Sequence, residues 1–133
     1  MKVKGHWIEK RDEDYLQMAA QATALAFEVD ADAVLGRSRA QPLVFARQTA
    51  YWLMHNIMGY SYCETGRMFD RDHGGIMHGV KKVEEELVQD SSSKHINGSW
   101  ANEIRASKEN FRRFYKVYKE VKPKEAKDVV EST

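Results

Sequence analysis

Hydrophobic residues recur at helical spacing along most of the chain. From Tyr15 to about Val29 the apolar side chains return every three or four residues, which predicts an alanine-rich amphipathic helix. The segment ADAVL after it predicts a short helical turn, capped by Asp30 and ended by Gly36. No stretch alternates apolar and polar residues as a β-strand would. The pattern therefore predicts an all-α fold.

The next apolar segment predicts the buried centre of the domain. Pro42 suits the first position of a helix, and the sequence after it, LVFARQTAYWLMHNIM, is apolar on most faces. Gly59 is expected to end this helix. The basic segment GRSRAQP before the helix predicts a loop.

Two further helices are predicted on either side of a tight turn. Ser61 and Glu64 form a capping-box pattern at the head of a short helix that runs through Phe69. The turn DRD follows, and Asp72 is placed to cap a helix that runs to about Gln89. Two helices joined by such a short turn indicate a helix-turn-helix.

A last amphipathic helix is predicted near the C-terminus. Ile104, Phe111 and Tyr118 repeat at seven residues, which would suit a dimer seam, whereas an aromatic stripe of this length more often packs onto its own domain. Pro123 is expected to end the helix. The predicted segments are an N-terminal arm over 1–14, a helix-turn-helix domain over 15–90, a loop over 91–99, a C-terminal helix over 100–121 and a flexible tail over 122–133.

The composition favours a soluble cytoplasmic protein with one compact domain. A chain of 133 residues is long enough for one core. No run approaches the roughly 18 to 20 apolar residues of a membrane span, and no apolar stretch follows the basic N-terminus as in a secretory signal. The single Cys63 excludes an internal disulfide, which suits a reducing compartment.

The net charge of +1 conceals a basic middle third. Residues 1–35 carry 4 Lys and Arg against 7 Asp and Glu, residues 36–82 carry 7 against 3, and residues 83–133 carry 10 against 10. An anionic partner responds to such a local excess, because charges are screened over about 10 Å at 0.1 M salt.

Glycines stand at the start of the second helix of the predicted helix-turn-helix. Each costs about 1 kcal/mol in a helix interior relative to alanine. With Ile76 on the buried face, Gly74 lies on the opposite side of the helix. In a helix-turn-helix, a backbone without side chains at this end lets DNA approach closely. Alternatively, Gly74 and Gly75 mark a frayed helix start. Gly79 lies nearer the buried face, which favours close packing against another helix.

The stretch from Val34 to Leu87 contains the motifs GRSR, ARQTAYWL and MGYSYCETGRMFDRDHGGIMHGVKKVEE, in this order. It resembles the C-terminal DNA-binding domain of DnaA, the bacterial chromosomal replication initiator, a Trp-repressor-like helix-turn-helix family. The last motif is similar to the family's Ser-x-x-Glu-x-Gly helix, followed by Phe, Arg-Asp-His, two small residues, two apolar residues, His and a Lys-rich helix end. With the preceding alanine-rich helix, the resemblance covers over half of the chain.

The resemblance implies an interface with double-stranded DNA. The basic loop would enter the minor groove, the start of the central helix would face the duplex backbone, and the start of the second motif helix would enter the major groove. Asp72 fits a cap better than a base contact, because phosphates repel a carboxylate. The implied DNA-binding residues are Arg37, Arg39, Arg47, Gln48, Arg71, His73, Gly74, Gly75, His78, Lys81 and Lys82.

The sequence departs from the family in two respects. Gly74 and Gly75 stand where the family has Ser or Thr, so the hydroxyls and methyl groups that read bases are missing. No G-x-x-x-x-G-K-[ST] phosphate loop is present, so no nucleotide site is expected. The chain is therefore expected to be a stand-alone copy of the DNA-binding domain and not an initiator by itself.

Other chemistry has little support in the sequence. His73 and His78 lie five residues apart, about 140° around a helix, and Cys63 is expected to pack within the motif, so neither a metal site nor a Cys-His hydrolase is expected. We expect a non-enzymatic DNA-binding protein in replication or its regulation, without a cofactor. The alternative is a protein-interaction module that binds a replication protein or forms a homodimer and has lost DNA binding, which the acidic first third favours.

Overall fold

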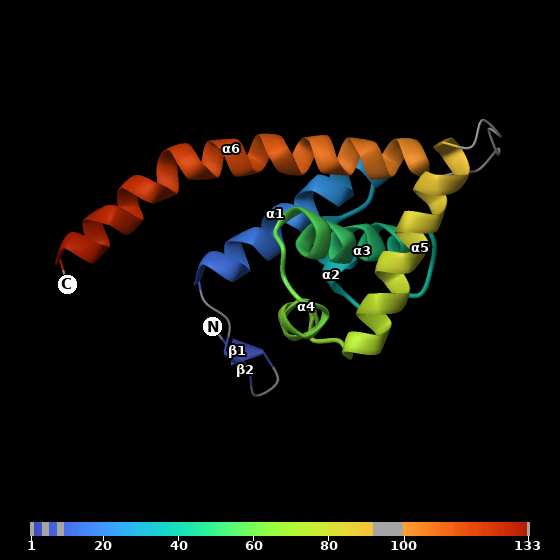
Figure 1. Cartoon of the computed structure of the whole chain (residues 1–133), viewed down its shortest axis with the longest axis horizontal. Coiled ribbons are helices and arrows are strands. Elements are labelled where there is room, and N and C mark those ends of the chain that lie inside the picture. The colour runs from blue at the N-terminus through green and yellow to red at the C-terminus, as the bar shows by residue number, and fades with distance from the viewer. Residues whose placement is uncertain (1, 4–5, 8–9, 92–99, 133) are drawn as a thin grey trace.

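The computed structural model describes residues 2–3, 6–7, 10–91 and 100–132, with side-chain surroundings for 11–89 and 100–121 (Figure 1). The helices are α1 (Lys10–Phe27), α2 (Ala31–Leu35), α3 (Leu43–Trp52), the π-helix η1 (Leu53–Ile57), α4 (Tyr62–Phe69), α5 (His73–Ser91) and α6 (Ala101–Ser132). Strand β1 (Lys2–Val3) pairs antiparallel with β2 (His6–Trp7) inside the predicted arm. Strands of two residues are too short to show alternation, so the sequence did not predict them. The all-α fold class is confirmed.

The first two helices differ from the sequence pattern only at their ends. Helix α1 starts at Lys10, before the predicted Tyr15, because its first turn is stabilised by Asp12 and Glu13 at the positive end of the helix dipole and not by apolar periodicity. The Asp30 side chain accepts a hydrogen bond from the Ala33 N–H at 3.2 Å, so its predicted capping of α2 is confirmed.

Helix α3 lies at the centre of the domain and packs against both α1 and α5 (Figure 1). Most of its residues are buried, as the apolar sequence predicts. Ala19 and Ala20 of α1 are fully buried, and their small side chains allow close packing of α1 against its neighbouring helices. The central helix continues as η1, and Gly59, with φ +79°, follows its end as predicted.

Helix α6 completes the core of the same domain. Ile104 and Phe111 are fully buried, and Trp100 stacks at 6.3 Å on Phe45 of α3. Most contacts of α6 are with α1. This arrangement confirms that the aromatic stripe of α6 packs onto its own domain. Phe111 is therefore not available to a dimer seam.

The predicted end of the last helix at Pro123 is wrong. Helix α6 continues to Ser132, and Figure 1 shows its ribbon bending in the C-terminal third. Proline lacks the N–H that would bond the carbonyl four residues earlier, so it removes one backbone bond and kinks a helix without having to end it. The predicted loop begins inside α5, which runs to Ser91, and the rest of it lies outside the described residues.

No helix in the described part of the chain is both long enough and apolar enough to cross a membrane.

Candidate nucleic-acid interface

Helix α4 starts with the predicted capping box. The Ser61 hydroxyl accepts a hydrogen bond from the Glu64 N–H at 3.0 Å, and the Glu64 carboxylate accepts one from the Ser61 N–H at 2.9 Å. The bond from the Ser61 backbone lowers the pKa of Glu64 by favouring its charged form. The capping box therefore fixes where the first helix of the motif begins.

The turn between α4 and α5 requires glycine at position 66. Asp70 takes a left-handed conformation with φ 58°, and the Arg71 N–H bonds the Gly66 carbonyl at 2.8 Å. A Cβ on Gly66 would lie 2.6 Å from the Arg71 carbonyl oxygen, which is backbone and cannot rotate away. This close approach sets the angle at which α5 leaves the turn.

Helix α5 presents the predicted faces. Asp72 Oδ2 accepts a hydrogen bond from the Gly74 N–H at 3.0 Å, which confirms the cap. Ile76 is fully buried, whereas Gly74 and Gly75 are exposed. Gly79 is buried where a Cβ would lie 2.8 Å from Tyr51, so the predicted packing against another helix is confirmed.

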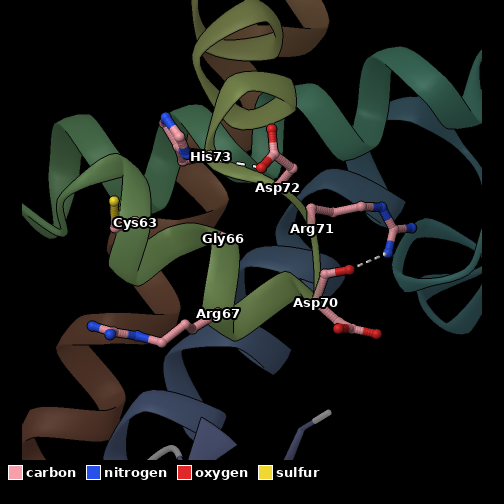
Figure 2. Close-up of a pocket in the computed structure, with 7 residues that line it drawn as sticks. All are labelled: Cys63, Gly66, Arg67, Asp70, Arg71, Asp72 and His73. Carbon is pink, nitrogen blue, oxygen red and sulfur yellow. Dashed lines mark hydrogen bonds and ion pairs between the residues drawn. The ribbon is translucent and has the colours of Figure 1, made fainter. Parts of the chain in front are cut away.

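Arg71 and Arg37 connect the basic loop to this turn. Arg71 Nη2 donates to the Gly36 carbonyl at 2.7 Å, and its Nη1 donates to the carbonyls of Phe69 and Asp70. Figure 2 shows the Arg71 side chain directed away from His73. Arg37 pairs with the Asp70 carboxylate at 3.1 Å. The basic loop is thus held beside the start of α5.

The Arg47 side chain holds the basic loop by hydrogen bonds. Its Nε, Nη1 and Nη2 donate to the carbonyls of Val34, Ser38 and Ala33 at 2.7, 2.9 and 3.2 Å, and the residue is 7% exposed. Burial lowers the pKa of its guanidinium. The expected orientation of Arg47 toward a duplex is therefore wrong, because two carbonyls of α2 and one of the basic loop accept hydrogen bonds from its three nitrogens. Gln48 is half-buried and lies close to Gly79.

The remaining basic side chains are available to a partner. Arg39 is exposed, and the structure gives it no hydrogen bond or ion pair with another described residue. Lys81 and Lys82 are likewise exposed and pair with none of the described glutamates that follow them on α5. The exposed predicted residues around the start of α5 and the loop are Arg37, Arg39, His73, Gly74, Gly75, His78, Lys81 and Lys82.

A shallow pocket beside the turn contains residues that the sequence did not single out for binding (Figure 2). Arg67 and Cys63 line it with His73, and both are exposed. The expected packing of Cys63 is therefore wrong, because the inward face of α4 is formed by Thr65, Met68 and Phe69 instead. Among the described residues no three His, Cys, Asp or Glu side chains gather as metal ligands.

The comparisons with known proteins agree with this geometry. The family model described as the bacterial dnaA protein helix-turn-helix matches residues 17–83. The chain is 37% identical over 65 residues to the chromosomal replication initiator protein DnaA of Deinococcus deserti, covering 49% of this chain and 14% of that protein. It is 36% identical over 75 residues to the protein of the same name from Thermomicrobium roseum, covering 56% and 16%.

A third relative, DnaA of Deinococcus radiodurans, is 32% identical over 78 residues, covering 59% of this chain and 17% of that protein. The chain thus spans about a sixth of the length of the curated relatives it matches. The matched segment contains α2, α3, α4 and most of α5, including the turn and the basic loop. The chain belongs to the bacterial DnaA helix-turn-helix family of DNA-binding domains.

Proposed function

We propose that this chain binds double-stranded DNA through the start of α5 and the basic loop, in replication or its regulation. The observation that carries the proposal is the position of the exposed Arg39 on a loop held by Arg71 beside the exposed backbone of Gly74 and Gly75. The start of α5 would enter the major groove, as second helices of this motif do. Arg39 would reach the adjacent minor groove, where arginine is favoured.

The two inward arginines have a supporting role in this proposal. Arg47 and Arg71 donate to carbonyls around the loop, so they shape the surface without needing to touch DNA. Contact with phosphates is left to Arg37, Arg39, Lys81 and Lys82, which are exposed. The proposed DNA-contacting cations are therefore only those that a duplex can reach.

Phosphate contacts would supply most of the affinity. Gly74 and Gly75 provide neither a hydroxyl nor a methyl group for a base edge, so sequence is read weakly at these positions. Backbone N–H groups of the first turn and the exposed cations would still bind phosphates, which position a protein without reporting sequence. We therefore propose a small preference for the family's nine-base box over random duplex.

Fluorescence anisotropy tests the proposal. The protein is titrated with a random duplex and with a box-containing duplex from about 50 to 300 mM salt. Arg39→Ala or Lys82→Ala should each lower the affinity and flatten the slope of log K against log salt by about 0.9. Arg113→Ala is the control, because Arg113 is an equally basic surface residue on α6, ion-paired with Glu109.

The alternative is a protein-interaction module built on the same fold. If neither duplex binds at the lowest salt, the DNA proposal fails and a replication protein or a second copy of the chain becomes the expected partner. If the duplexes bind but Arg39→Ala and Lys82→Ala leave the affinity and the slope unchanged, DNA binding stands and the proposed docking is wrong.

A further inference from the structure

A line of basic side chains runs along α6, outside the surface assigned above. Lys108, Arg112, Lys116 and Lys119 follow one another at spacings of four, four and three residues, and we call them the α6 stripe. At about 100° per residue these spacings place all four within about 80° of one another. The stripe covers 12 residues, and its first and last members are about 16 Å apart along the helix.

The charge of the stripe is not neutralised within the described part of the chain. Residues 101–121 of α6 carry six basic and three acidic residues. Arg112 and Lys116 pair with no other described residue, and Lys119 lies over the Tyr115 ring at 5.3 Å. Glu109 pairs instead with Arg113, which lies off the stripe.

Two acidic residues of α1 have tyrosine partners and not side chains of the stripe. Asp14 accepts a hydrogen bond from the Tyr118 hydroxyl at 3.2 Å, and Asp12 accepts one from the Tyr60 hydroxyl. Neither carboxylate forms an ion pair with a side chain of the stripe. The stripe therefore keeps a positive field toward solvent.

The stripe lies far from the proposed DNA-binding surface. Figure 1 shows α6 along one side of the domain and the start of α5 on the opposite side, beside α4. Glu86, near the end of α5, accepts a hydrogen bond from the Trp100 N–H at the start of α6. The 13 residues from His73 to Glu86 place the start of α5 about 20 Å from the end of α5 that meets α6.

We propose that the α6 stripe binds the phosphate backbone of a second DNA duplex, so that one molecule holds two duplexes together. A straight row of cations suits an extended anion, and duplex DNA carries one charge per about 1.7 Å of its axis. Contacts of this kind carry no sequence information. The second duplex can therefore have any sequence. The two-duplex arrangement rests on the proposed function of the α5 surface.

A capture experiment tests the proposal. A box-containing duplex is immobilised and loaded with the full chain, and a fluorescent random duplex is then added at about 100 mM salt. The unchanged protein should capture the second duplex. Arg112→Gln combined with Lys116→Gln should reduce capture about tenfold, because two phosphate contacts are lost. Its affinity for the first duplex alone should be unchanged.

A matched pair of variants controls for surface charge. Arg112→Gln and Arg113→Gln remove the same charge from neighbouring exposed positions of one helix, but only Arg112 belongs to the stripe. We expect capture to fall for Arg112→Gln and to persist for Arg113→Gln. Circular dichroism of each variant should match that of the unchanged protein.

The outcomes separate this proposal from the function on which it rests. No binding to the first duplex contradicts the proposed function. If the first duplex binds but the second duplex is not captured, the proposed function stands and the second DNA site is overturned. This is the result expected if the partner of the stripe is an acidic protein. Capture that survives the double variant assigns bridging to other residues or to a dimer. If the double variant binds the first duplex more weakly and the unchanged protein captures no second duplex, the stripe contacts the first duplex. This result also overturns the proposal.

Discussion

At the scale of single residues, two arginines eight positions apart have opposite surroundings. Arg39 is exposed, while Arg47 is buried beneath the same loop with all three nitrogens bonded to carbonyls. A charge exposed on a fixed loop can meet a partner, and a buried charge with full hydrogen bonding holds structure. Family motifs alone do not separate these roles.

Arg47→Met should therefore destabilise the fold. It removes the donor from the buried Val34 carbonyl and from the Ser38 carbonyl, whereas the Ala33 carbonyl keeps a hydrogen bond from the Gly36 N–H at 3.1 Å. An unsatisfied buried group costs about 1 to 3 kcal/mol, and the packing of the Arg47 side chain is lost as well. We expect a loss of about 2 to 4 kcal/mol in the free energy of unfolding, measured by urea denaturation. Arg39→Met is the control and should change stability little. Equal stability of the two variants would contradict the supporting role of Arg47.

Glycines of the motif should respond to alanine in opposite directions. Gly66→Ala places a Cβ 2.6 Å from a backbone oxygen and should cost about 2 kcal/mol. Gly75→Ala meets nothing within 4 Å and should gain about 0.5 kcal/mol, because alanine restricts the unfolded chain. Thermal unfolding of both variants checks the signs. A destabilised Gly75→Ala would mean that the start of α5 requires glycine.

Restoring the family's side chain should restore base reading. Gly75→Thr has space for its side chain and would add a methyl and a hydroxyl at the exposed start of α5. We expect the ratio of affinities for box and random duplex to rise about fivefold, the effect of about 1 kcal/mol. Anisotropy with both duplexes measures the ratio, and Gly75→Ala is the control. An unchanged ratio would place position 75 away from the bases.

The local features of the site follow from the sequence, and the long-range ones do not. Asp30, Asp72 and the Ser61–Glu64 box were predicted because a cap bonds residues two or three positions away. The partners of Arg47 lie up to fourteen residues away. The sequence does not show which backbone carbonyls near the end of α2 lack a hydrogen-bond donor. The inward orientation of the Arg47 side chain can therefore be seen only in the folded structure.

At the scale of elements, helix ends are harder to predict than helix faces. The buried stripe of α6 was expected from its aromatic residues, whereas its passage through Pro123 was not. Faces follow from many apolar residues together. An end depends on one or two residues whose effect the adjoining turns can outweigh.

The contact between α1 and α6 should weaken in alkali. Burial raises the pKa of Tyr15 from 10.0 to about 12, with charges on Tyr115 and Tyr118 adding to the effect. A raised folded-state pKa gives stability that is full below pH 10.0 and is lost as the pH rises toward 12. Urea denaturation across this range should show the loss. Tyr15→Phe, which cannot ionise, should lose less; an equal loss in both proteins would assign the effect to the other tyrosines.

At the scale of the whole molecule, α6 is part of the core and not an appendage. The matched family segment ends at residue 83, yet Ile104 and Phe111 fill fully buried positions against α1. The helix-turn-helix therefore depends on a helix outside that segment. Its basic stripe lies on the same helix, so both proposed DNA surfaces belong to one packed domain.

Truncation should show this dependence. A chain ending at residue 99 exposes the α1 surface that α6 covers, and losing Phe111, Ile104 and their neighbours at about 2 to 3 kcal/mol each removes most of a stability of about 5 to 15 kcal/mol. We expect no cooperative unfolding transition by calorimetry. A chain ending at residue 121 keeps these side chains and should unfold near the full-length temperature. If the chain ending at 99 also unfolds cooperatively and binds DNA, then α6 is an addition to an independent domain, and the two surfaces need not be held in a fixed arrangement.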